Sequence, residues 1–128
     1  MISACILCRD DSGTLQACLE SVRPFVDELI CVDTGSTDNS PQIAKRYADR
    51  WELFLDCNDP ATELIDDFSL ARNHALSLAS GDFHLWVDAD DILLGGENLR
   101  ALCDSAPPEA LFLVAYDYQH DAQGRPTC

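Results

Sequence analysis

The sequence predicts an α/β protein, an αβα sandwich with a mostly parallel sheet. Short apolar runs typical of buried strands alternate with segments whose apolar residues recur every three or four positions, as in amphipathic helices. Turn-forming polar residues directly follow several of the apolar runs. Parallel strands joined through helices use right-handed crossovers, so this alternation indicates an open sheet. With 128 residues, the chain is expected to form one domain over residues 1–128.

The first half of the chain contains three expected strands and two expected helices. The strands are expected at residues 2–8, 28–32 and 51–55. The first helix is expected from Thr14 to Val22, because Leu15, Cys18, Leu19 and Val22 share one helical stripe and Pro24 follows. The second is expected at residues 41–49, with Ser40 as a cap and Pro41 at the first helical position.

The second half contains a longer helix and two further strands. Apolar residues spaced by three and four predict a helix over residues 64–78, closed by Gly81. Phe83, Leu85 and Val87 alternate with polar or amphipathic residues, which predicts a strand. A short helical connection is expected within residues 92–103, a last strand at 111–118 and a loop at 119–128.

The strand over residues 83–87 runs into three carboxylates, Asp88, Asp90 and Asp91. At an effective dielectric constant of 20, two carboxylates about 4 Å apart repel each other by roughly 4 kcal/mol. A cation between them would remove that repulsion, and oxygen ligands favour a hard ion such as Mg²⁺ or Mn²⁺. The alternative for an isolated Asp-x-Asp motif is a solvated acidic turn.

Two other polar clusters, Arg9 to Asp11 and Asp33 to Ser36, also follow apolar strands directly. In open α/β sheets, ligands bind beyond the carboxyl ends of the strands. The three clusters are therefore expected to meet at one edge. Gly35 would let backbone approach a ligand, and the helix start after it could offer N–H groups to a phosphate.

Charge and composition argue against some classes of binding partner. A formal net charge of −15 argues against nucleic acid or an anionic membrane as the main partner, and a phosphorylated ligand would need a bridging metal. The odd number of cysteines, 7, favours reduced, buried thiols. No targeting signal or membrane span is recognisable, so a cytoplasmic place is expected, with the inner face of a membrane as the peripheral alternative.

The order and spacing of four motifs resemble those of the family 2 glycosyltransferases of the GT-A fold. The motifs are Ser3 to Asp11, Val32 to Asp38, Ala71 to Asn73, and Gly81-Asp82 leading to Val87 to Asp91. The resemblance implies inverting transfer of a sugar from a nucleotide-diphosphate donor, such as a UDP-sugar, with Mn²⁺ or Mg²⁺ on the diphosphate. The sequence departs from the common pattern in having Thr34 where many members have a second Asp, and Arg9-Asp10-Asp11 where Lys-Asn-Glu is frequent.

Carried over to this sequence, the resemblance implies that Asp33 contacts the base, that Asp88 lies near the ribose or the water shell of the metal, and that Asp90 coordinates the metal. The expected nucleotide-binding residues are Arg9, Asp11, Asp33, Gly35, Ser36, Arg72, Asn73 and Asp88, and the expected metal ligands are Asp88 and Asp90. The chain resembles the donor-binding half of the family's domain, and the other half usually supplies the catalytic carboxylate, so no general base is assigned.

Two further functions stay open at this point. One is a non-catalytic nucleotide-sugar binding module or inactive fragment, which nucleotide binding without turnover would indicate. The other is a nucleotidyltransferase, which usually has a Gly-rich basic loop where this chain has Arg9-Asp10-Asp11. The acceptor of a transferase would be a glycan, a lipid or a protein. The last strand is expected to leave an apolar edge that no other part of the chain covers. A second copy of the chain or a C-terminal partner domain would cover that edge.

Overall fold

A computed structural model describes residues 1–107 and 109–115. The sheet is 4-stranded and entirely parallel, in the order β3-β2-β1-β4. Its strands are β1 (Ile2–Cys8), β2 (Glu28–Asp33), β3 (Arg50–Leu53) and β4 (Phe83–Trp86). The first four predicted strands are therefore confirmed, with ends that shift by a few residues.

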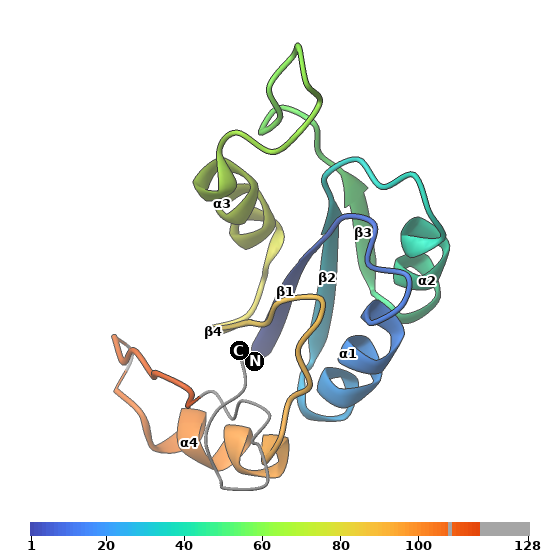
Figure 1. The fold of residues 1–128 in the computed structure, drawn as a ribbon. Helices are drawn as coiled ribbons and strands as arrows, with labels where there is room; N and C mark the ends of the chain where they lie inside the picture. The colour runs from blue at the N-terminus through green and yellow to red at the C-terminus, as the bar shows by residue number, and fades with distance from the viewer. Residues whose placement is uncertain (108, 116–128) are drawn as a thin grey trace, which may run out of the picture.

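Helices cover both faces of the sheet, as the predicted sandwich requires. Figure 1 shows α1 (Leu15–Val22) and α2 (Ser40–Tyr47) on one side of the strands and α3 (Phe68–Leu78) on the other. A short helical segment follows β4, with a 3₁₀ turn at Gly96–Asn98 and α4 at Leu99–Ser105. Within the described part of the chain, no helix has the length and apolarity needed to cross a membrane.

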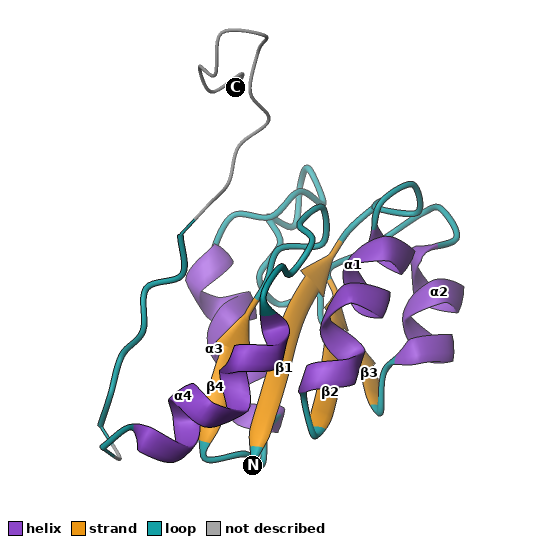
Figure 2. Cartoon of the chain, turned by 90° about the horizontal axis from the view of Figure 1, so that it is seen from below, coloured by secondary structure: helices purple, strands orange, loops and turns teal. Residues whose placement is uncertain are grey.

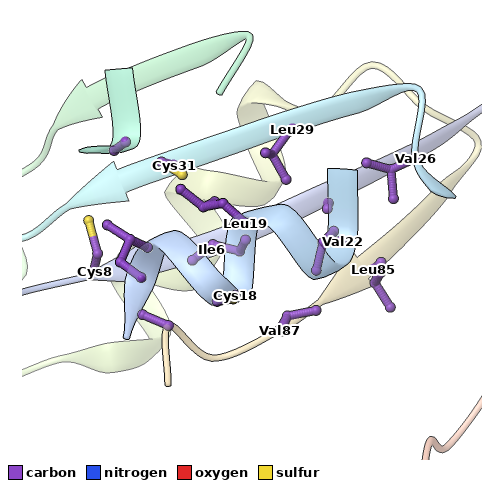
Figure 3. Packing of buried hydrophobic residues seen from close by; sticks show 14 of the residues in the cluster. Ile6, Cys8, Cys18, Leu19, Val22, Val26, Leu29, Cys31, Leu85 and Val87 are labelled. Atoms are coloured by element: carbon purple, nitrogen blue, oxygen red, sulfur yellow. The ribbon is translucent and has the colours of Figure 1, made fainter. Parts of the chain in front are cut away.

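The larger part of the core lies between the sheet and α1. Leu15, Cys18, Leu19 and Val22 are the buried residues of α1, as their spacing predicts. They pack against β1 and β2 side chains such as Ile6, Leu29 and Cys31, and against Leu85 and Val87 from β4 and its end (Figure 3). A smaller cluster on the opposite face joins Cys5, Ile30, Val32 and Ala75 beneath α3.

Helix α3 begins four residues later than the apolar spacing predicts. Its cap is Asp67, whose Oδ1 accepts a hydrogen bond of 3.0 Å from the backbone N–H of Leu70. Leu64, which the spacing placed in the helix, lies in the preceding loop and is 61% exposed. The helix is followed by Ala79 in an extended conformation, so Gly81 does not close it. A local side-chain cap has overridden the apolar periodicity.

The strand expected at residues 111–118 is absent from the part of that range that the structure describes. Residues 111–115 contain no strand, and 116–118 lie outside the described residues, as does the expected loop at 119–128. A strand needs a hydrogen-bonded neighbour, and this segment has none among the described strands. Leu111 and Leu113 are 86% and 92% exposed, which agrees with the expected uncovered apolar surface. That a partner covers this apolar surface stays a prediction.

Candidate functional site

Loops that follow β1, β2 and β4 leave the sheet at the same edge. The parallel register pairs Cys8 with Asp33 and Cys5 with Trp86. Figure 2 shows the strands running in one direction, with the loops beyond their carboxyl ends gathered together. The edge that the sequence predicts as the binding site therefore exists in the fold.

Hydrogen bonds join the loop after β1 to the loop after β2. Asp10 has a positive φ of 55°, and its Oδ1 accepts bonds of 2.6 and 3.2 Å from the backbone N–H groups of Thr37 and Asp38. In return, the backbone N–H groups of Asp10 and Asp11 donate to the hydroxyls of Ser36 (2.9 Å) and Ser40 (2.8 Å). These bonds join the loop that carries the predicted residue Asp11 to the loop that carries Ser36.

Asp33 is fully buried and organises the turn that follows it. Its Oδ1 accepts the backbone N–H groups of Gly35 (2.8 Å) and Ser36 (2.7 Å), and its Oδ2 lies 3.7 Å from the Cys8 sulfur. Gly35 has a φ of +114°, which a residue with a Cβ rarely adopts. The predicted contact between Asp33 and a base stays a prediction, because in this structure its oxygens bond to the protein.

Arg9 closes a cavity beside this turn. Its guanidinium donates to the backbone carbonyls of Thr34 (3.1 Å) and Glu63 (2.5 Å), and the Asn58 side chain donates to the same Thr34 oxygen (2.8 Å). The cavity has a volume of about 630 Å³, and its lining residues are Arg9, Gly35, Leu55, Asp56, Asn58, Asp59, Pro60 and Glu63. It is large enough for a nucleobase, and most of its wall comes from a loop that carries no recognisable binding motif.

A second group of predicted residues lies between α3 and the end of β4. The Arg72 guanidinium is 3.9 Å from Asp88 Oδ1 and lies over the ring of Trp86, with Cζ 4.5 Å from the ring centroid. The Trp86 Nε1–H donates to the same Asp88 oxygen at 3.0 Å. Asn73 is exposed beside Arg72, and its side chain makes no hydrogen bond to the described residues.

Charges connect the two groups across the edge of the sheet. Burial raises the pKa of Asp11, and the negative charge of the exposed Asp90 raises it further. The pKa of Cys18, on α1 beneath these loops, is raised to about 12 by burial first and then by the carboxylates of the Asp88–Asp91 turn and Asp11. These carboxylates are close enough for their charges to interact, and the Arg72 guanidinium lies beside one of them, Asp88.

The carboxylates can supply part of a metal site. Within residues 1–107 and 109–115, no group of three or more His, Cys, Asp or Glu side chains is arranged to hold an ion. Mg²⁺ and Mn²⁺ in nucleotide sites are commonly held by one or two carboxylates together with phosphate oxygens and water. Asp88 and Asp90, two residues apart on one exposed turn, fit that incomplete set.

The predicted site residues thus form two neighbouring groups. One group, at the ends of β1 and β2, consists of Arg9, Asp11, Asp33, Gly35 and Ser36. In the other group, Arg72 extends from α3 towards Asp88, and Asp88 and Asp90 follow the end of β4. Sequence reasoning missed the wall formed by residues 55–63, since nothing in that segment distinguishes a binding loop from any other. It also missed Trp86, whose only signal is an aromatic residue two positions before Asp88.

The chain matches one known family and is similar to several known proteins. The sequence profile described as Glycosyl transferase family 2 matches residues 3–106. A TPR repeat-containing protein of Synechococcus elongatus is 42% identical over 112 residues, which cover 86% of this chain and 25% of that protein. An uncharacterized glycosyltransferase of Escherichia coli, YibD, is 40% identical over 67 residues, or 50% of this chain and 17% of that protein. The chain thus spans a quarter or less of these relatives.

Solved structures show the same fold. Glucosyl-3-phosphoglycerate synthase of Mycobacterium tuberculosis in complex with UDP aligns with a TM-score of 0.63 at 25% identity, covering 82% of this chain and 39% of the enzyme. The same enzyme in complex with Mn²⁺, UDP and glucosyl-3-phosphoglycerate aligns over 70% of this chain and 33% of the enzyme, with a TM-score of 0.57 and 26% identity.

Proposed function

The chain belongs to glycosyl transferase family 2, and on that premise we propose that it binds the donor in inverting, metal-dependent transfer of a sugar from a UDP-sugar. The observation that carries the proposal is the meeting of three acidic and polar loops at one sheet edge, with Arg72 beside Asp88. The UDP and Mn²⁺ bound by the structurally similar synthase support the same donor and ion.

In the proposed complex, the two groups of residues contact different parts of the donor. The cavity beside Arg9 and Gly35 would take the base, with Asp33 holding the shape of the turn and residues 55–63 forming the opposite wall. Ser36 and Asp11 would border the ribose side. Arg72 and the Asp88–Asp91 turn would face the diphosphate, since a guanidinium and a cation-binding carboxylate pair both complement phosphate oxygens.

A divalent ion would be held by Asp90 and Asp88. When bound, it would stabilise the negative charge that develops on the diphosphate leaving group. With a net charge of −15, the chain repels a free nucleotide diphosphate, and the ion would offset that repulsion. We assign no general base and propose a glycan, lipid or protein acceptor, whose binding groups would lie outside the residues described above.

Calorimetry tests the proposal directly. UDP, GDP and TDP are titrated into the protein with and without Mn²⁺, and UDP is expected to bind most tightly, with an affinity that Mn²⁺ raises. Replacing Asp90 by Ala should remove most of the Mn²⁺-dependent gain, about tenfold or more. Asp104→Ala, which removes an exposed carboxylate on α4, is the matched control and should retain the gain.

Three outcomes would decide between the functions. Unchanged metal dependence in Asp90→Ala, with an unchanged circular dichroism spectrum, would count against the metal site. No UDP binding by the unmodified chain would overturn the proposal. UDP-sugar binding without hydrolysis or transfer would favour the second candidate, a non-catalytic nucleotide-sugar binding module, because the side chains described at the site are donor-binding groups.

A further inference from the structure

Trp86 connects two residues of the proposed donor site that lie far apart in the sequence. It is the last residue of β4 and faces α3, where it packs against the cluster formed by Cys5, Ile30, Val32 and Ala75. The neighbouring strand β1 pairs with it at Cys5. Packing on the sheet and beneath a helix restricts the indole ring far more than a surface side chain is restricted.

The ring presents two different surfaces to the site. Its edge donates from Nε1 to Asp88 Oδ1 at 3.0 Å, and its face lies 4.5 Å from the Arg72 guanidinium carbon. An indole is the strongest of the natural aromatic partners for a cation over its face. One side chain therefore contacts both the acidic residue and the basic residue that would meet the metal and the diphosphate.

The direct ion pair is too weak to fix this geometry. Arg72 and Asp88 are 3.9 Å apart, and their side chains are 48% and 49% exposed. Ion pairs exposed to this extent contribute little, because water and salt screen the charges and both side chains lose rotational freedom. In each contact to the indole ring, only one flexible charged side chain has to be ordered, because the partly buried ring already packs against the sheet and α3.

We propose that Trp86 is a positioning residue of the donor site, which orients Asp88 through its indole N–H and Arg72 through its ring face. This inference rests on the proposed function. Holding both charged groups in advance reduces the ordering that donor binding would otherwise require, which raises affinity without adding a contact to the donor. Trp86 itself need not touch the nucleotide.

Two substitutions separate the two contacts. Trp86→Phe removes the N–H donor to Asp88 but keeps an aromatic face for Arg72, whereas Trp86→Leu removes both. We expect Trp86→Phe to weaken UDP binding about fivefold in the presence of Mn²⁺ and less than twofold in its absence, since the metal-facing carboxylate alone is released. Trp86→Leu should weaken UDP binding under both conditions.

The protein contains a matched control. Trp51, the other of its 2 tryptophans, lies on β3 at the opposite edge of the sheet, and Lys45 Nζ lies 4.0 Å from its ring centroid. Trp51→Phe therefore removes an indole beneath a cation away from the site, and it should leave UDP affinity unchanged. Urea midpoints of all variants identify any loss that comes from general destabilisation.

Tryptophan fluorescence tests the contacts of Trp86 without any nucleotide-sugar donor present. In the Trp51→Phe background, emission comes from Trp86 alone, and Arg72→Met or Asp88→Asn should shift its maximum. Unshifted emission in both variants, or equal losses for Trp86→Phe and Trp86→Leu with and without Mn²⁺, would refute the positioning role. If the unmodified chain binds no UDP, the proposed function is refuted. That result comes from the unmodified protein alone, so it is distinguishable from a failure of the positioning role of Trp86.

Discussion

Asp33 offers the sharpest test of how the turn after β2 is held. Asp33→Ala removes the acceptor of two backbone N–H groups, those of Gly35 at 2.8 Å and Ser36 at 2.7 Å. A hydrogen bond to a charged acceptor contributes about 1.5 to 3 kcal/mol. Because Gly35 and Ser36 are only half-buried, water can reach the released donors, so the lower value applies to each. The expected loss is about 3 kcal/mol in the free energy of unfolding.

Urea unfolding followed by circular dichroism measures this loss, with a slope that should not change if the same surface is exposed. Asp33→Asn keeps an oxygen in place and should lose only about half as much. Asp59→Ala is the matched control: Asp59 Oδ1 also accepts two backbone N–H groups, from Ala61 and Thr62 at 2.8 Å each, but in a loop outside the sheet. A loss for Asp33→Ala no larger than that for Asp59→Ala would refute the reasoning.

Three further predictions concern stability and reactivity. A Cβ at Gly81 would lie 2.6 Å from Ser3 Oγ, so Gly81→Ala should lower the free energy of unfolding by about 2 kcal/mol, whereas Gly13→Ala, with open space around it, should not. Hydrogen bonds hold the pKa of Asp38 well below its usual range. They stabilise the fold fully above the unfolded pKa, so Asp38→Asn should be less stable than the unmodified protein at pH 6, and this difference should shrink as the pH falls below about 4, with part of it still present at pH 2. Burial raises the pKa of Cys31 to about 12, and its thiol should resist alkylation at pH 8 until denaturant is added; rapid labelling of the native protein would contradict its burial.

Some features of the fold follow from local sequence, and others do not. The periods of the strands and of α1 follow from residues a few positions apart, so the spacing of Leu15, Cys18, Leu19 and Val22 identified the buried face correctly. The start of α3 depends instead on one capping side chain, Asp67, and an apolar pattern extends past such a cap without revealing it.

The residues themselves determined the α/β alternation, the strand ends that carry polar clusters, and the closeness of Asp88 to Asp90. Parallel strands bring those clusters to one edge whatever the strand order, so local pattern was sufficient. Only the tertiary structure decided that Asp33 turns inward, that Arg9 reaches Glu63 across 54 positions, and that Trp86 lies beneath Arg72. Such partners come from different elements, and their meeting depends on how helices pack on the sheet rather than on any period in the chain.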